Sequence, residues 1–182
     1  NTLNLFISVV VQCTSHILYK GSTINKMYDD DVRIRPARPE EAEELTDIAW
    51  RSKSYWDYPV DVMNIFREML NIEQDFIENN PSYLIEHEET DEKVGFYALE
   101  KKDGKLWLEH LWVLPDEIGT GLGGKLFLHA CEIAETMGAE ELYIVSDPNA
   151  EEFYRHMGAE KIGEERTEGL PERLLPVMRI KL

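Results

Sequence analysis

The 182-residue sequence has few cysteines and few basic residues. Its two cysteines, Cys13 and Cys131, are too few and too far apart for a disulfide framework or a cysteine-based metal site, so we expect a reducing, cytoplasmic environment. Lys and Arg number 19 against 36 Asp and Glu, which gives a net charge of -17. A surface this acidic repels nucleic-acid backbones and anionic lipid, so we expect neither nucleic acid nor a membrane as a partner.

Long hydrophobic runs are also missing. The apolar run at residues 3–11 is far shorter than the ~20 residues that span a bilayer. It also lacks the basic start and the small-residue cleavage site of a signal peptide. Residues 1–26 contain no acidic residue, whereas Met27 opens an acidic stretch directly before an alternating strand. We therefore interpret residues 1–26 as an N-terminal extension outside the fold and residues 27–182 as a single domain.

Apolar periodicity predicts alternating strands and helices in residues 27–182. Strands are predicted over 32–36, 83–87, 94–100, 106–113, 142–145, 161–165 and 174–182. Helices are predicted from Pro39, across 60–70, through Phe76, over 122–137 and from Pro148 to Gly158. The short polar connectors at 88–93 and 101–105 favour an antiparallel meander. This order indicates an α+β domain around a mixed sheet.

Four glycines follow the fourth predicted strand and open a helix: Gly119, Gly121, Gly123 and Gly124. Backbone N–H groups in such a turn can close around a phosphate, and the helix dipole adds positive potential. The glycines fit a P-loop spacing, but Leu126 stands where a magnesium-binding hydroxyl belongs. They also fit the dinucleotide pattern G-x-G-x-x-G, although residues 114–118 separate the turn from the strand. A tight connection without a ligand is a further interpretation, and it leaves the entropic cost of four glycines unexplained.

Two blocks of the sequence resemble motifs A and B of the GNAT N-acetyltransferase superfamily. Residues 106–131 are similar to motif A, in which a central strand leads to an Arg/Gln-x-x-Gly-x-Gly/Ala turn that holds the pyrophosphate of coenzyme A. Gly121 and Gly123 take the paired glycine positions, and Ile118 stands in the Arg/Gln position. Residues 147–159 resemble motif B, the Asn…Ala…Phe-Tyr…Gly block.

The resemblance spans residues 32–182 and implies a fold and an activity. The fold is a central twisted sheet of about seven strands, mixed and mostly antiparallel, with helices on both faces. The activity is transfer of the acetyl group of acetyl-CoA, the cosubstrate, to an amine by direct attack in a ternary complex, without a metal. The resemblance also leaves room for a homodimer.

The resemblance further implies which residues contact the cofactor. Main-chain groups of a bulged central strand would bind the acetyl group and the pantetheine arm, the glycine turn would bind the pyrophosphate, and an asparagine would bond the pantetheine amides. By position these residues are Leu111, Trp112, Val113, Gly119, Thr120, Gly121, Leu122, Gly123, Gly124 and Asn149.

The chemistry requires a neutral amine, because only about one part in 10³ of an alkyl amine with pKa ~10.4 is neutral at pH 7. Family members often place a base at the position of Glu109. His110 is the alternative, and strand alternation predicts that the two side chains point to opposite faces. Tyr154 matches the tyrosine whose hydroxyl reaches the departing sulfur. A solvated carboxylate and a packed aromatic are the structural alternatives for Glu109 and Tyr154.

The acceptor is predicted to bind at an aromatic connector between the first two helices, where Trp56 and Tyr58 line a pocket or pack on the core. The resemblance adds the loop at residues 167–173. Together with the acidic surface, the connector points to a small molecule or peptide that bears an amine.

Two other functions stay open at this stage. A non-catalytic CoA-binding sensor would keep the fold without turnover, and Ile118 in the Arg/Gln position leaves room for it. A dinucleotide-dependent oxidoreductase would use the same glycines.

Overall fold

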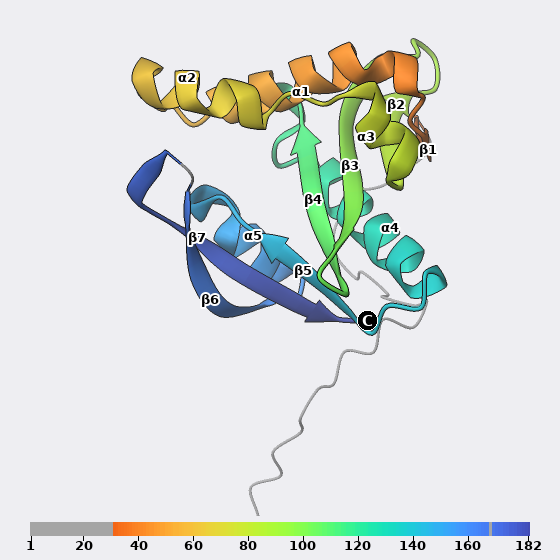
Figure 1. Cartoon of the computed structure of the whole chain (residues 1–182). Coiled ribbons are helices and arrows are strands. Elements are labelled where there is room, and N and C mark those ends of the chain that lie inside the picture. The colour runs from red at the N-terminus through yellow and green to blue at the C-terminus, as the bar shows by residue number, and fades with distance from the viewer. Residues whose placement is uncertain (1–30, 168) are drawn as a thin grey trace, which may run out of the picture.

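The computed structural model describes residues 31–167 and 169–182, so the proposed N-terminal extension lies outside the described residues. Seven strands form one sheet in the order β1-β2-β3-β4-β5-β7-β6 (Figure 1). The strands are β1 (Val32–Pro36), β2 (Ser82–His87), β3 (Lys93–Lys102), β4 (Lys105–Val113), β5 (Glu141–Val145), β6 (Glu160–Thr167) and β7 (Leu170–Lys181). Strands β4 and β5 are parallel, and every other neighbouring pair is antiparallel. The predicted mixed, mostly antiparallel sheet is confirmed.

Helices cover both faces of this sheet. They are α1 (Ala42–Ser54), α2 (Val60–Met69), α3 (Gln74–Asn79), α4 (Leu122–Thr136) and α5 (Glu151–His156). Adjacent residues of a strand point to opposite faces. On β3, the Tyr97 hydroxyl lies 2.7 Å from Nδ1 of His129 on α4. The neighbouring Phe96 ring instead contacts His110, which also contacts Phe76 of α3.

The core explains why α4 forms where the apolar spacing predicts it. Its buried side chains recur every three or four residues, which is the pattern of a helix with one apolar face. They are Leu122, Leu126, Phe127, Ala130, Cys131 and Ala134. Gly138, with a φ of 78°, follows the helix in the left-handed conformation that commonly ends one.

The β4 strand departs from regular pairing in a way that shapes the site. Ala98 of β3 pairs with His110 and Leu99 pairs with Leu108, so Glu109 is an extra residue in a β-bulge. On its other side, β4 pairs with β5 only over Leu106–Leu108. Beyond Leu108 the two strands therefore separate, and no described strand pairs with that edge of residues 109–113.

The last hairpin is longer than the sequence predicts. Strand β7 begins at Leu170, and Thr167 of β6 pairs with it, so Thr167 and residues 170–173 lie in strands of a hairpin rather than in the loop that we expected. Two prolines and the Leu174-Leu175 pair interrupt the alternation that would have revealed the strand. At the turn, a side chain on Gly169 would approach Ile65 of α2 to 3.2 Å, so the hairpin tip touches α2. No helix among the described residues is long and apolar enough to cross a membrane.

Candidate active site

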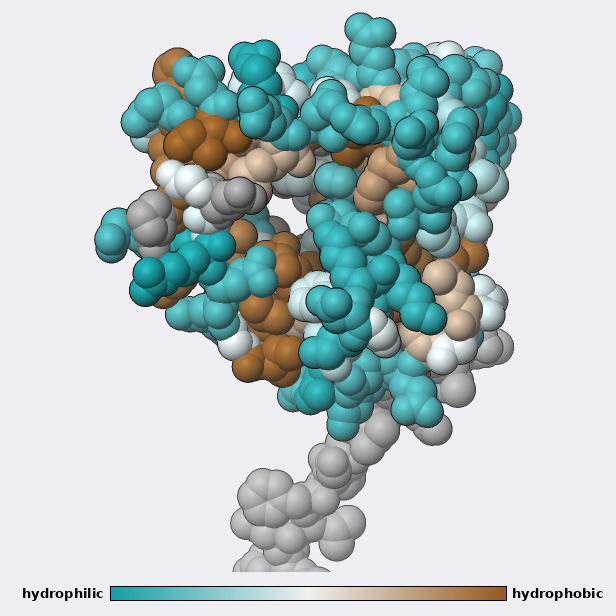
Figure 2. Space-filling model, viewed as in Figure 1, coloured by the Kyte–Doolittle hydropathy of each residue, from teal (hydrophilic) through white to brown (hydrophobic). Residues whose placement is uncertain are grey.

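The opening between β4 and β5 is the centre of the candidate site. Leu111, Trp112 and Val113 lie on the separated half of β4 and pair with β3 on one side only. Figure 2 shows that the surface is hollowed between the layer of α1 and α2 and the β6–β7 hairpin, with apolar residues along the wall below. The opening leaves one edge of the β4 backbone able to hydrogen-bond a ligand, because unpaired strand edges expose N–H and C=O groups.

The glycine turn lies at the start of α4, after β4 and a short 3-10 turn at Pro115–Glu117. Gly119 and Gly121 have φ values of 88° and 101°, which other residues rarely adopt. Gly121 precedes the helix and supplies no side-chain cap. The first backbone N–H groups of α4 are therefore left for an anionic ligand, which the helix dipole also favours.

The remaining residues of the turn have other roles. The Thr120 hydroxyl lies 2.9 Å from the Glu117 carbonyl oxygen, so it bonds back into the turn. Side chains at Gly123 and Gly124 would come within 3.7 Å of Phe153 and 3.8 Å of Met157, which places these glycines where α4 passes the chain segment of α5. The turn therefore combines backbone donors with a close approach of two helices.

Tyr154 projects from α5 into the protein and is 6% exposed. Its ring packs against Phe127 and Phe153 at centroid distances of 5.7 and 5.0 Å. Its hydroxyl has no hydrogen-bond partner among the described residues. Burial and the nearby charge of Asp147 raise the pKa of Tyr154 above its usual value, so the phenol stays protonated at neutral pH and is a hydrogen-bond donor.

The strand alternation behind the prediction that Glu109 and His110 point to opposite faces is interrupted at these two residues. The reason is the bulge, which adds one residue to β4 and breaks the two-residue alternation at this point. Glu109 Oε2 lies 2.9 Å from Lys102 Nζ. The positive charge of Lys102 also lowers the pKa of His110, after the larger effect of burial. The Glu109 carboxylate is paired with Lys102, and its side chain is about one third exposed.

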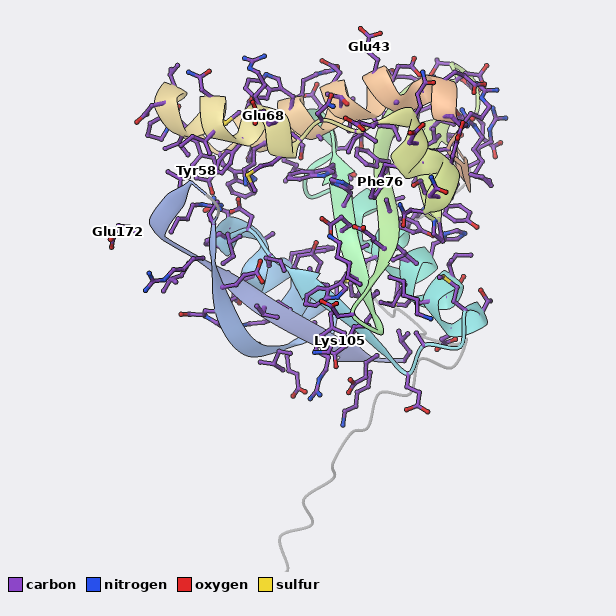
Figure 3. The ribbon with its side chains drawn as sticks, viewed as in Figure 1. Glu43, Tyr58, Glu68, Phe76, Lys105 and Glu172 are labelled. Atoms are coloured by element: carbon purple, nitrogen blue, oxygen red, sulfur yellow. The ribbon has the colours of Figure 1, made fainter. Side chains whose placement is uncertain are left out.

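His110 lies in an aromatic surrounding. Its Nδ1 accepts a hydrogen bond of 3.3 Å from Trp112 Nε1. Its ring meets Phe76 edge-on at 5.4 Å, and Figure 3 shows Phe76 reaching from α3 toward β4. Burial lowers the pKa of His110 to about 4, so the imidazole is neutral at pH 7. A neutral ring with one nitrogen already engaged is a weak candidate for the base.

A charged cluster that the sequence did not predict closes the opening on the side of α1 and α2. Asp147, which follows β5, binds Lys53 of α1 through Oδ2, and the same oxygen accepts a 2.8 Å bond from Arg173 of β7. The Tyr58 hydroxyl lies 2.9 Å from both Asp147 oxygens. We define Lys53, Tyr58, Asp147 and Arg173 as the Asp147 cluster. It joins three segments that are distant in sequence.

Aromatic rings enclose the two cations of the Asp147 cluster. Lys53 Nζ lies 4.4 Å from the centre of the Phe66 ring and 5.9 Å from that of Trp112. The Arg173 guanidinium lies 5.0 Å from the same Phe66 ring. Burial lowers the pKa of Lys53, the attraction of Asp147 opposes this, and Arg173 adds to the lowering. Lys53 lowers the pKa of Asp147 in turn, against the effect of burial, so the carboxylate stays ionised.

The predicted acceptor and pantetheine residues divide between this cluster and the surface. Tyr58 belongs to the cluster and lies between α2 and the tip of the β6–β7 hairpin (Figure 3). Trp56 is 38% exposed and packs against Tyr55, outside the cluster. Asn149 donates from Nδ2 to the Tyr58 hydroxyl at 3.0 Å, which leaves its Oδ1 to accept a bond. The helix cap at this point is Asp147, whose Oδ1 accepts from the Asn149 N–H.

Two cavities lie outside the opening between β4 and β5. A hollow of about 340 Å³ is lined by Lys105, Gly138 and Tyr143 among others, at the opposite end of β4. A smaller one of about 90 Å³ lies between the β1–β2 edge and the outside of the glycine turn. Within residues 31–167 and 169–182, no group of three His, Cys, Asp or Glu side chains is placed to hold a metal ion.

Comparisons with known proteins agree with this geometry. The model of the acetyltransferase (GNAT) family matches residues 42–159. No curated protein matches the sequence. The PaiA N-acetyltransferase from Thermoplasma acidophilum, solved with coenzyme A, has a TM-score of 0.68 at 20% identity and aligns over 83% of this chain and 99% of its own.

Two further solved structures have the same fold. A GCN5-related N-acetyltransferase from Rhodopseudomonas palustris has a TM-score of 0.69 at 20% identity, over 84% of this chain and 96% of its own. The ribosomal-protein-S18-alanine N-acetyltransferase from Escherichia coli has a TM-score of 0.60 at 16% identity, over 82% of this chain and 93% of its own. At these identities the likeness establishes the fold.

Proposed function

The chain belongs to the GNAT acetyltransferase family, and from this premise we propose that it transfers the acetyl group of acetyl-CoA to a primary amine of a small molecule or peptide. The observation that carries the proposal is the opening between β4 and β5, with the glycine turn at one end and the Asp147 cluster at the other. A solved neighbour of the same fold binds coenzyme A.

The two parts of coenzyme A would meet two different kinds of donor. The pyrophosphate would bind the N–H groups at the start of α4, where Gly119 and Gly121 allow the backbone to approach it closely. The acetyl group would lie along the free edge of Leu111–Val113, whose N–H groups are preorganised to stabilise a tetrahedral oxyanion.

Direct attack in a ternary complex fits the nucleophiles that are available. Cys131 is 1% exposed in the middle of α4, packed in the core, so it is a poor carrier of an acetyl group. The amine would attack the thioester carbon, the C–S bond would break, and the thiolate would leave toward Tyr154. Because the phenol stays protonated, Tyr154 would stabilise that sulfur by a hydrogen bond.

Glu109 is the proposed base, acting directly or through water. Glu109 lies at the bulge, directly before the free edge of β4, and its carboxylate is partly exposed. These two properties make Glu109 a better candidate for the base than His110. His110 would instead support the strand, because it is neutral and bonded to Trp112.

The dinucleotide interpretation finds little support in this geometry. A dinucleotide-binding unit places its glycines after a strand of a parallel βαβ sheet. Here the strand before the turn, β4, belongs to an antiparallel meander with β2 and β3 and is parallel to β5 alone.

The proposal is tested by thermal melting of the full chain with acetyl-CoA, coenzyme A, NAD and ATP. A ligand that binds the native state alone raises the melting temperature as RT ln(1+[L]/Kd) predicts. We expect acetyl-CoA and coenzyme A to stabilise the protein and NAD and ATP to have no effect. Stabilisation by NAD without stabilisation by acetyl-CoA would overturn the proposal. Binding of acetyl-CoA without turnover of any amine would favour a non-catalytic sensor, for which the absence of an Arg or Gln side chain at Ile118 leaves room.

A further inference from the structure

The Asp147 cluster has one carboxylate for two cations. Lys53 and Arg173 both bind Oδ2 of Asp147. Besides burial, the positive charge of Arg173 lowers the pKa of Lys53, so the two cations repel each other. Tyr58 contributes no charge, because burial raises the pKa of its phenol. The cluster therefore carries one excess positive charge in a place where Lys53 is 7% and Arg173 16% exposed. Asp147 offsets only one of the two positive charges, so a second anion beside Lys53 and Arg173 would be attracted by the charge that remains.

The two cations also have hydrogen-bond donors to spare. An ammonium has three donors and a guanidinium has five. Lys53 uses one, on Asp147. Arg173 uses three contacts, on Asp147, Tyr58 and Thr167. Among the described residues, the only buried side-chain nitrogen or oxygen without a partner is Nε of Arg179, so the spare donor at Nε of Arg173 faces solvent, where an anion that enters the opening can reach it.

The cluster faces the place where an acceptor would lie. Lys53 lies against the Trp112 ring, and Trp112 is on the free edge of β4 that the proposed function assigns to the acetyl group. Arg173 comes from the hairpin that faces α2 across the opening, and the neighbouring Glu172 points outward into solvent (Figure 3). An anion bound by both cations would therefore lie beside the thioester, and an amine in the same molecule could reach it.

We infer that the acceptor carries a carboxylate near its amine, and that Arg173 and Lys53 bind this carboxylate. The inference rests on the proposed acetyl transfer. A carboxylate matches the single excess charge, whereas a phosphate monoester carries about -1.5 to -2 at pH 7. It also fits the planar donor fork of Arg173, which a carboxylate can engage with two oxygens. The substrate class is thus an amino acid or a similar aminocarboxylate, despite the acidic surface of the whole protein.

The test compares α-amino acids with their primary carboxamides, which keep the amine and lose the anion. Release of CoA gives kcat/KM for each member of a pair, in the wild-type protein and in Arg173→Gln. Differences in the intrinsic reactivity of the two amines cancel when the acid-to-amide ratio is compared between proteins. We expect Arg173→Gln to lower this ratio about 10- to 100-fold, the scale of a lost charged hydrogen bond.

Two further variants control the comparison. Arg166→Gln removes the same charge from an exposed position of β6 in the same hairpin and should leave the ratio unchanged. Arg173→Lys keeps a cation beside Asp147 but loses the fork, so the ratio should fall less. It carries the test if Arg173→Gln does not fold.

Each other result decides against the inference in its own way. If Arg173→Gln lowers the rates with acids and amides equally, the cation acts on the reaction itself and the carboxylate proposal is overturned. If the ratio does not change, the carboxylate proposal is also overturned, while acetyl transfer stands. If the wild-type protein neither binds acetyl-CoA nor releases CoA with any amine, the proposed function fails and the carboxylate proposal with it.

Discussion

Tyr154 illustrates how a single environment can set the role of a side chain. The ring is packed between Phe127 and Phe153, which alone would make it a core residue. A core tyrosine, however, usually bonds its hydroxyl, and this one has no partner among the described residues. Burial also keeps the phenol protonated. These properties suit a donor that waits for the sulfur of coenzyme A.

We predict that Tyr154→Phe lowers kcat about 10- to 100-fold, which corresponds to one missing transition-state hydrogen bond. The affinity for acetyl-CoA and the melting temperature should change little, because the ring is kept. Tyr143→Phe, which removes a hydroxyl from β5 at its Glu141 partner, is the matched control. A Tyr154→Phe enzyme with full activity would show that the residue only packs.

Glu109→Gln should lose activity at neutral pH and regain it as the pH rises toward the pKa of the amine. The reason is that a base is needed only while the amine is protonated. Glu100→Gln is the control, because Glu100 binds the same Lys102 at 2.8 Å without being at the bulge. The pH profile of the rate with each variant provides the measurement. An equal loss at every pH would make Glu109 structural.

His110 should make the protein less stable in acid. Its pKa is about 4 in the folded protein and about 6.5 when exposed, so the unfolded state binds the proton first as the pH falls. Stability is therefore lost between pH 6.5 and 4. The loss from pH 6.5 to pH 5 is about 1.6 kcal/mol, because the unfolded imidazole is only half protonated at pH 6.5 and a full proton is worth roughly 1.4 kcal/mol per pH unit. Denaturant unfolding of the wild type and His110→Gln at several pH values measures this. Parallel profiles would contradict the prediction.

At the scale of the elements, the start of α4 is where fold and ligand binding meet. Gly121 precedes the helix with a φ of 101°, and Gly138 follows it with a φ of 78°. Neither position is crowded, since an added side-chain carbon would meet nothing within 4 Å. Alanine at either site should therefore cost stability through its backbone conformation alone, about 1–2 kcal/mol.

The two glycines make a matched pair for testing the cofactor site. Gly121→Ala should weaken acetyl-CoA binding as well as stability, because its side chain would stand beside the amides that the pyrophosphate needs. Gly138→Ala, at the other end of the same helix, should lose similar stability and keep its affinity. Titration calorimetry with acetyl-CoA and thermal melting separate the two effects. Equal affinities in both variants would remove the turn from the cofactor site.

The sequence predicts most of these elements because their signals are local. The apolar spacing of α4 and the strand before Pro36 can be recognised from a few neighbouring residues. The bulge at Glu109 cannot, because it depends on how β3 and β4 align. The Asp147 cluster is also hidden, since Lys53 and Asp147 are 94 residues apart. Asp147 also caps the helical turn that starts at Pro148, because its Oδ1 accepts a bond from the Asn149 N–H.

At the scale of the whole molecule, the net charge and the site charge differ in sign. The chain carries -17, and the Asp147 cluster carries one positive charge within it. An acidic surface lowers the local concentration of free anions and favours cations. A buried pair of cations nevertheless attracts a bound anion at contact distance, and this attraction exceeds the repulsion from the more distant acidic groups of the surface. The substrate is therefore better inferred from the cluster than from the composition.

We retain as a proposal that residues 27–182 form a single domain.

The central claim is that this chain passes an acetyl group from acetyl-CoA directly to an amine. Initial rates of CoA release, measured while acetyl-CoA and an amine that is turned over are both varied, test it most directly. Direct attack in a ternary complex predicts double-reciprocal lines that intersect, an acetylated amine in equal amount to the released CoA, and no acetylated protein. Parallel lines with acetyl-enzyme detected by mass spectrometry would contradict the account, because they require a covalent carrier.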